Sequence, residues 1–269
     1  MKERILVTGG TGYIGSHTVV ELQNSGYDVV IVDNLSNSSA DVVDNIEKVS
    51  GIRPAFEKLD CLDLEGMDKL FTKYPGIKGI IHFAASKAVG ESVQKPLLYY
   101  RNNLVSLINL LELMPKHGVE GIIFSSSCTV YGQPDVLPVT EEAPIKKAES
   151  PYGNTKQINE EIIRDTVASG SPINAIMLRY FNPIGAHPTA LIGELPNGVP
   201  QNLFPYVTQT AMGIREKLSV FGDDYDTPDG SCIRDYIYVV DLAKAHVIAM
   251  DRILNNKQKE KVEVFNIGT

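Results

Sequence analysis

Short apolar runs alternate with helix-like stretches along the first two thirds of the chain, and this alternation narrows the possible folds more than any other feature. The runs are continuous in apolar character, which is typical of strands covered on both faces. They comprise Ile5–Val7, Val29–Val32, Ile80–Ala84, Ile122–Phe124 and Ile176–Leu178. The helix-like stretches between them are Ser16–Ser25, Gly66–Lys73, Leu97–Lys116 and Pro151–Ala168. Because strand and helix alternate, the sequence predicts an α/β fold with a doubly wound parallel sheet.

The pattern changes after about Arg179. Pro- and Gly-rich segments replace the periodic runs at Asn182–Gly185, Leu195–Pro200 and Tyr225–Gly230. We therefore expect a larger domain over residues 1–180 and the start of a smaller, less regular domain over residues 181–269. Val240–Leu254 again has the pattern of an amphipathic helix, so residues 236–254 are expected to pack back on the first domain.

Composition and charge restrict the partners of the protein. Hydrophobic residues make up 43% of the 269 residues and charged residues 22%, which is ordinary for a globular protein and argues against disorder. Lys and Arg number 25 against 33 Asp and Glu, and the net charge of -8 removes any general attraction to nucleic acid or to an anionic membrane. A bound phosphate must therefore be held by local groups.

The N-terminal residues and the cysteines favour a reducing compartment. The first residues lack the apolar segment that a secretory signal requires. Cys61, Cys128 and Cys232 are odd in number and show no CxxC spacing, so they indicate neither a disulfide framework nor a zinc site. We expect a cytoplasmic protein with reduced thiols and no bound metal.

A glycine-rich loop follows the first apolar run directly. Thr8–Gly15 carries glycines at Gly9, Gly12 and Gly15 and leads into a helix that begins near Ile14. Such glycines permit a sharp turn, close approach of the backbone to a pyrophosphate, and close packing of helix on strand. The helix N-terminus adds N–H groups and partial positive charge. The loop therefore predicts a dinucleotide site of the Rossmann type.

The next apolar run ends in a carboxylate, Asp33. An acidic side chain about 20 residues beyond such a loop accepts hydrogen bonds from the adenosine ribose and repels a 2'-phosphate. The predicted cofactor is therefore NAD and not NADP.

Further polar residues follow later strands of the predicted sheet. Asp60 is a candidate adenine partner, and Lys87 a candidate partner for the nicotinamide ribose or for a phosphate, since ligands lie outside the carboxyl ends of parallel strands. A surface position for Lys87 is the alternative. His82 falls inside an apolar run and is expected to be a core histidine.

Tyr152 and Lys156 stand four residues apart in a predicted helix, where Ser150 is the expected N-cap and Pro151 the first helical residue. The two side chains therefore share a face. An ammonium and a positive nicotinamide ring both favour a phenolate. Tyr152 can then remove the proton of a substrate hydroxyl while hydride leaves the same carbon.

Ser127 follows the run Ile122–Phe124 and is the candidate hydrogen-bonding partner for the same substrate oxygen. Cys128 beside it is expected to be a packing residue, since no histidine nearby in the sequence would activate it. The chain also lacks the GxSxG pattern, so a serine hydrolase is not indicated.

Several motifs together resemble the extended short-chain dehydrogenase/reductase family over essentially all 269 residues. They are Thr8–Gly15, Ala88–Pro96, Ser125–Gly132, Tyr152–Lys156, Arg179–Pro183, Gly185–Pro188 and Arg234–Ile237. The resemblance implies NAD-dependent interconversion of UDP-galactose and UDP-glucose, by reversible hydride transfer at the sugar C4 through a 4-keto intermediate. It also implies a homodimer that uses the helices at 97–116 and 151–168.

The resemblance implies roles for individual residues. Tyr152 would be the base and acid, Lys156 would tune it and bind the nicotinamide ribose, and Ser127 would bridge to the sugar hydroxyl. Besides these three, the positions matching cofactor contacts are Gly9, Gly12, Tyr13, Ile14, Gly15, Asp33, Asn34, Leu35, Ser36, Asn37, Ser38, Asp60, Cys61, Phe83, Ala84, Ala85, Ser86, Lys87, Asn102 and Phe181. The positions matching UDP-sugar contacts, besides Ser127 and Tyr152, are Lys87, Asn182, Asn202, Leu203, Ser219, Val220, Phe221 and Arg234.

Two other functions stay open at this point. An epimerase of a related UDP-sugar, acetylated or a uronate, would share the same motifs, because pocket volume decides that choice. A non-catalytic NAD-sensing protein is the second alternative. Members of the family continue beyond the step seen here at Asn266–Gly268, so the second domain is expected to be truncated at Thr269.

Overall fold

The computed structural model describes residues 2–269 and is organised around a seven-stranded sheet. The strand order is β3 (Ala55–Lys58), β2 (Asp28–Asp33), β1 (Arg4–Thr8), β4 (Ile77–His82), β5 (Gly121–Ser127), β6 (Asn174–Tyr180) and β9 (Val262–Ile267). Every neighbouring pair is parallel. The chain builds outward from β1 in both directions, so the order reverses between β1 and β4. In such sheets the ligand crevice lies at the carboxyl ends of the strands beside this reversal.

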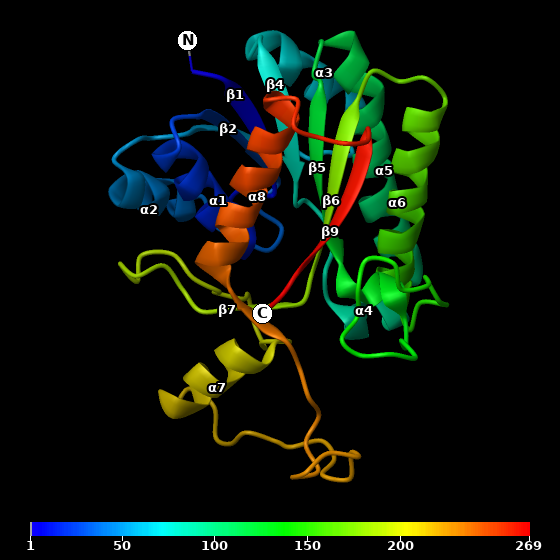
Figure 1. Ribbon diagram of the computed structural model, residues 1–269. Coiled ribbons are helices and arrows are strands. Elements are labelled where there is room, and N and C mark those ends of the chain that lie inside the picture. Colours follow the sequence, from blue (N-terminus) through cyan, green and yellow to red (C-terminus); the bar gives the residue numbers. More distant parts are fainter. Residues whose placement is uncertain (1) are drawn as a thin grey trace.

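Helices cover both faces of the sheet, as Figure 1 shows. One layer consists of α1 (Tyr13–Asn24), α2 (Asp41–Ser50) and α8 (Val239–Leu254), and the other of α3 (Leu64–Lys73), α5 (Pro96–Lys116) and α6 (Pro151–Ala168). Within β1, Leu6 packs in the core between the sheet and the layer of α3, α5 and α6. Ile5 and Val7 pack on the opposite face, beneath the layer of α1, α2 and α8. Both faces are buried, which explains the continuous apolar runs and confirms the predicted doubly wound fold.

The chain leaves the sheet after β6 and returns to it at α8. Between them, β7 (Asn182–Ile184) pairs in parallel with β8 (Tyr236–Tyr238), and α7 (Leu203–Ala211) begins the segment that hangs below the sheet in Figure 1. The helix α8 packs against α1, and β9 then joins the sheet beside β6. The segment that packs on the larger layered body therefore extends through β9, beyond the expected residues 236–254. The domain boundary itself stays a prediction.

The ends of the third apolar run and the start of the first helix define the crevice edge. The third run forms a strand at Ile77–His82, so Phe83 and Ala84, the last residues of that run, lie in the loop after it. The first helix begins at Tyr13, within the glycine-rich segment and close to the predicted start near Ile14. Apolar character therefore continues past the end of the strand into the loop at the carboxyl edge of the sheet.

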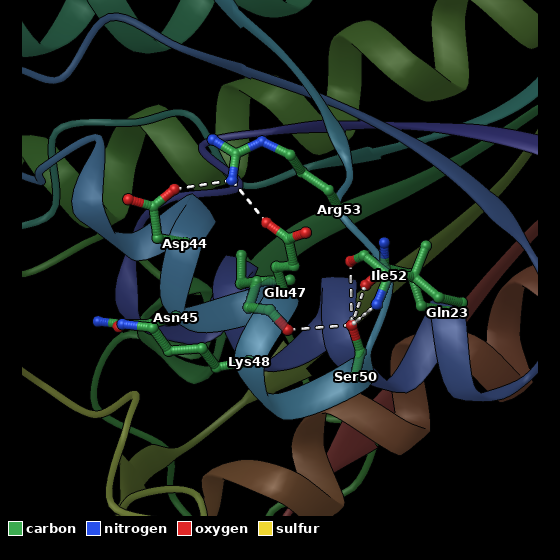
Figure 2. A network of polar contacts seen from close by, with 9 residues as sticks. Gln23, Asp44, Asn45, Glu47, Lys48, Ser50, Ile52 and Arg53 are labelled. Atoms are coloured by element: carbon green, nitrogen blue, oxygen red, sulfur yellow. Dashed lines mark hydrogen bonds and ion pairs between the residues drawn. The ribbon is translucent and has the colours of Figure 1, made fainter.

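The helix α2, which the apolar pattern did not predict, is held by polar contacts at its C-terminal end (Figure 2). Arg53 Nη1 lies 2.8 Å from Asp44 Oδ1 and 2.6 Å from Glu47 Oε2. The hydroxyl of Ser50 donates to Gln23 Oε1 of α1 at 2.8 Å, which joins the two helices. The ion pairs are exposed and contribute little each, so the contact with α1 and the buried Val43 and Ile46 fix the helix.

The shorter elements lie at the carboxyl side of the sheet. They are the helix α4 (Val89–Gln94) and the 3-10 helix η1 (Cys128–Tyr131), which follow β4 and β5. Within residues 2–269, no helix combines the length and the apolar character needed to cross a membrane.

Replacing Gly121 with alanine tests the packing of α8 on the sheet. A Cβ at Gly121 would lie 2.6 Å from Cγ2 of Ile253, whose side chain is 3% exposed. Overpacking of this kind costs about 1–3 kcal/mol, so Gly121→Ala should lower the midpoint of urea unfolding. Gly90→Ala in α4 is the control, because a Cβ there meets open space. Equal midpoints for the two variants would contradict this packing.

Candidate active site

The glycine loop forms the centre of the crevice edge. Gly9 has a φ of +70°, and its N–H donates to the carbonyl of Val32 at 2.8 Å. A Cβ at Gly15 would lie 2.2 Å from the carbonyl oxygen of Gly9, so the start of α1 can approach the loop only as glycine. The helix begins after Gly12, which has no side chain to cap it. Its first N–H groups are thus available to an anion.

Asp33 lies at the end of β2 and organises the next loop. Its side chain is 7% exposed, and its carboxylate accepts hydrogen bonds from the N–H of Thr11 at 3.2 Å and of Leu35 at 2.9 Å. The hydroxyl of Ser38 also donates to it, at 3.2 Å. Asn34 then reaches Asp60 beyond β3, with Nδ2 to Oδ2 at 2.9 Å. The candidate residues 33–38 and Asp60 therefore form one continuous surface beside the glycine loop.

Hydrogen bonds hold the loop after β4 against the glycine loop, on the side away from Asp33. The N–H of Phe83 donates to the carbonyl of Thr8 at 3.0 Å. The N–H of Ser86 donates to Asn103 Oδ1 at 2.8 Å, and Asn102 Nδ2 donates to the Ser86 hydroxyl at 3.3 Å. These contacts bring the candidates at Phe83–Lys87 and Asn102 together at the crevice.

Two other candidates have defined surroundings. The thiol of Cys61 is buried, and burial raises its pKa to about 12, so the sulfur is inert as a nucleophile. Phe181 follows β6, and its N–H donates to the carbonyl of Ile267 in β9 at 3.3 Å.

Tyr152, Lys156 and Ser127 meet at the carboxyl end of β5. The helix α6 begins as predicted, with the Ser150 hydroxyl accepting from the N–H of Gly153 at 3.1 Å. Lys156 is 3% exposed, and its Nζ lies 5.8 Å from the ring centroid of Tyr152. The side chain of Ser127 lies close enough to the phenol of Tyr152 to lower its pKa. The three predicted catalytic candidates are therefore neighbours.

The electrostatics of this group differ from the expectation. Burial raises the pKa of Tyr152 above its ordinary value, and the nearby Ser127 side chain acts in the opposite direction. Burial also lowers the pKa of Lys156 to about 8, against the carboxylate of Glu160, which raises it. Within the described residues 2–269, Lys156 is not among the groups that shift the pKa of Tyr152, so the expected lowering of that pKa by the ammonium is not seen. Nζ donates to the carbonyl of Ser125 at 2.6 Å instead, and both groups are desolvated.

Lys87 meets a residue that the sequence reading missed. Its Nζ lies 3.3 Å from Oε1 of Glu194, and the side chain of Glu194 is only 9% exposed. The same carboxylate oxygen accepts a hydrogen bond from Asn202 at the start of α7. Glu194 thus joins a candidate of the sheet edge to a candidate of the second region. Its signal in the sequence is weak, because it stands in an irregular Pro- and Gly-rich stretch.

The remaining substrate candidates are dispersed. Asn182 is anchored, with Nδ2 donating to the carbonyl of Asp235 at 2.8 Å. Leu203 is 50% exposed on the first turn of α7. Ser219, Val220, Phe221 and Arg234 lie exposed between α7 and β8. The Arg234 guanidinium donates to the neighbouring carbonyl of Ile233 at 2.8 Å. Among the described contacts, none joins these four residues to Tyr152, so their role stays a prediction.

His82 is a core histidine, as predicted. It is 2% exposed, its Nδ1 lies 2.7 Å from the hydroxyl oxygen of Thr8, and burial lowers its pKa to about 3. The part of the chain from 2 to 269 contains no group of three or more His, Cys, Asp or Glu side chains placed to hold a metal ion.

A parallel sheet with a glycine loop at the strand-order reversal and a Ser–Tyr–Lys group beside it defines a dinucleotide-binding oxidoreductase-type fold. Residues 5–268 match the sequence profile of the NAD dependent epimerase/dehydratase family, and the chain belongs to that family. It is 52% identical to a UDP-glucose 4-epimerase of Bacillus subtilis, covering 98% of this chain and 77% of that one.

Two further comparisons agree. The chain is 50% identical to a UDP-glucose 4-epimerase of Homo sapiens, covering 100% of this chain and 78% of that one. It is also similar to the crystal structure of UDP-glucose 4-epimerase from Bifidobacterium longum in complex with NAD+ and UDP. That similarity has a TM-score of 0.94 at 50% identity and covers 99% of this chain and 78% of the other.

Replacing Lys156 with methionine tests the burial of its ammonium. The pKa of Lys156 falls from 10.5 to about 8 on folding, so the unfolded chain binds more protons between those values and stability rises with pH there. At pH 7 Lys156 is protonated, and the whole free-energy cost of burying its charge lowers the stability of the folded parent. Lys156→Met removes this cost and should be more stable than the parent by on the order of 1–3 kcal/mol.

The measurement is chemical denaturation at pH 7 and near pH 10, where the difference between Lys156→Met and the parent should narrow. Lys244→Met is the control, since Lys244 is 55% exposed. A difference for Lys156→Met that does not change with pH would contradict the lowered pKa.

Proposed function

We propose that this protein interconverts UDP-galactose and UDP-glucose by NAD-dependent epimerisation at C4 of the sugar. The observation that carries the proposal is the group Ser127, Tyr152 and Lys156 beside the glycine loop. The names of the relatives support the reaction, and the Bifidobacterium longum structure with NAD+ and UDP supports the cofactor and the nucleotide.

The residues present fit NAD. The loop leaves no space for side chains at Gly9 and Gly15, where a Cβ would lie 2.9 Å from the nitrogen of Ala84 and 2.2 Å from the oxygen of Gly9. The backbone can therefore approach a pyrophosphate at the N-terminus of α1. Asp33 is a buried carboxylate at the adjacent strand end, suited to ribose hydroxyls and unsuited to a 2'-phosphate.

Tyr152 is the proposed base and acid. When bound, oxidised NAD would supply a hydride acceptor and a positive charge. In its phenolate form, Tyr152 would take the proton of the sugar O4 during oxidation and, as the phenol so formed, return it during reduction. Ser127, which lies close enough to the phenol to lower its pKa, donates to the same sugar oxygen. Lys156 holds positive charge behind both groups.

Burial of Tyr152 has a useful consequence in this scheme. A phenol with a raised pKa keeps its proton in a neutral site, so it does not carry an uncompensated negative charge when no substrate is present. The phenol gives up this proton to solvent, and so becomes able to act as a base, only once positive charge lies near the ring. The base is thereby linked to the oxidised state of the site.

We also propose a homodimer formed through α5 and α6 and a cytoplasmic location. The two helices pack against each other, and α4 and α5 expose the apolar side chains of Val93, Leu97, Leu98 and Ile108. Unpaired Cys61, Cys128 and Cys232 favour a reducing compartment. Residues 181–269 are the proposed start of the UDP-sugar domain, with the segment from 236 packing back on the first domain.

A single assay tests the reaction. The purified protein receives UDP-galactose with no added NAD, and formation of UDP-glucose is measured. The parent should turn over, whereas Tyr152→Phe should lose about 10²–10⁴-fold in kcat because the proton acceptor is missing. The variant should still bind NAD.

Near-normal rates in Tyr152→Phe would overturn the proposed base. Turnover of UDP-N-acetylgalactosamine or a UDP-uronate in place of UDP-galactose would reassign the substrate to a related UDP-sugar. Intact NAD binding with no turnover of any of them would favour an NAD sensor.

Cofactor choice is tested at Asp33. Loss of hydrogen bonds to a charged group corresponds to about 1.5–3 kcal/mol, so Asp33→Ala should reduce the preference for NAD over NADP by roughly tenfold to a hundredfold. The dissociation constants of both dinucleotides would be measured by fluorescence titration. Asp28→Ala, at the opposite end of the same strand and paired with Arg4, is the control. An unchanged preference in Asp33→Ala would mean that other residues read the ribose.

A further inference from the structure

A buried ion pair lies behind the candidate catalytic group. The guanidinium of Arg179 donates hydrogen bonds to both carboxylate oxygens of Glu160, from Nε to Oε1 at 2.9 Å and from Nη2 to Oε2 at 2.6 Å. Their side chains are 3% and 6% exposed. Ser126 donates to Glu160 Oε1 at 2.6 Å, and Arg164 lies 3.9 Å from Oε2 on the solvent side. A pair this deep is retained only where its hydrogen bonds are satisfied.

The pair belongs to a row of polar residues across three strands. Ser126 of β5 stands opposite Arg179 of β6, which stands opposite Asn266 of β9. Tyr131 of η1 closes the row: its hydroxyl accepts from Arg179 Nη1 at 2.9 Å and donates to Asn266 Oδ1 at 2.6 Å. The network therefore fixes α6 to the sheet at a single position near the carboxyl ends of the strands.

The same face of α6 carries the candidate catalytic residues. Tyr152, Lys156 and Glu160 follow one another at four-residue spacing, so they lie in line on the helix. Two of them bond to consecutive serines of β5: Lys156 donates to the carbonyl of Ser125, and Glu160 accepts from the hydroxyl of Ser126. Tyr152 lies near the next serine, Ser127, whose side chain lowers its pKa. Glu160 is the member of this line that is also held by a charge from another strand.

We propose that Glu160, clamped by Arg179 and Ser126, is a positioning residue for the reaction. Its carboxylate holds α6 in register with β5 and keeps Lys156 protonated beside Tyr152. This inference rests on the proposed function for its role in turnover.

The surroundings of Lys156 explain why one carboxylate has this effect. The side chain lies over the ring of Phe124 in β5, at 4.9 Å from Nζ to the centroid. From β4 it faces His82, whose pKa is lowered by burial and by Lys156 itself, so that histidine is neutral. On its own helix it faces Tyr152, a neutral phenol, and Glu160. Glu160 therefore supplies the negative charge that opposes the effect of burial on Lys156.

Two variants test the proposal. Glu160→Gln removes the charge and keeps the size of the side chain. It leaves Arg179 buried without a counter-charge, so the paired variant Glu160→Met with Arg179→Met is the safer form, because apolar replacement of a whole buried pair is tolerated. The control is Arg252→Met with Glu263→Met, which removes a second bidentate pair, with Nε to Oε2 at 2.6 Å and Nη2 to Oε1 at 2.8 Å, between α8 and β9.

The first readout does not require turnover. The Lys156 Nζ would be titrated by NMR in lysine-labelled protein, with its signal assigned from Lys156→Arg. We expect the pKa of Lys156 to fall by about one unit in Glu160→Gln, since an opposite charge nearby has been removed, and to stay in place in the control. In the paired variant the fall should be smaller, because the positive charge of Arg179 is removed as well. An unchanged titration in folded Glu160→Gln would overturn the proposal, whether or not the parent turns over UDP-galactose.

The second readout is kinetic. In both Glu160 variants kcat should fall at least tenfold while KM for the UDP-sugar changes little. In Glu160→Gln the decline of kcat at high pH should also begin about one unit lower. The control pair should lose stability without either change. Equal effects in both pairs would show that Glu160 acts only through stability and would overturn the positioning role.

Discussion

The contact between α6 and the carboxyl end of β5 determines the arrangement of the whole candidate site. It places an ammonium and a phenol, Lys156 and Tyr152, in the same desolvated space as three backbone-linked serines. Burial favours the neutral form of both groups, since it raises the pKa of Tyr152 and lowers that of Lys156, so the charged forms are not stabilised there. The rest of the fold has to hold them in place, and the two apolar cores below and above the sheet provide the required rigidity.

The two ends of the crevice achieve rigidity differently. Around the glycine loop, close backbone approach does the positioning: the Gly9 N–H bonds to Val32, and the start of α1 lies against Gly9 with no room for a side chain at Gly15. Around β5, paired charges and hydrogen bonds do it, through Glu160 and Arg179. A surface that receives a dinucleotide backbone needs open N–H groups, whereas a surface that transfers protons needs side chains fixed in direction.

Sequence reasoning predicted the sheet, most of its helices and the residues at its carboxyl edge, because apolar periodicity and the glycine spacing reflect burial directly. It missed α2, where only Val43 and Ile46 are buried, and β9, whose residues are all half-buried. It also missed the electrostatic state of Tyr152 and the partners of Arg179. Those depend on which strands lie side by side, and the register of Ser126, Arg179 and Asn266 cannot be read from local spacing.

The second region was predicted least well, and the reason is physical. Residues 213–235 form no helix or strand, and Val220 and Phe221 are 80% and 87% exposed. Without burial there is no periodic pattern to read. The exception is Glu194, whose 9% exposed side chain joins Lys87 to Asn202. Because one carboxylate contacts both parts, a displacement of α7 would change the partners of Lys87, and the charge of Lys87 at the crevice edge is thereby linked to the region proposed to hold the UDP-sugar.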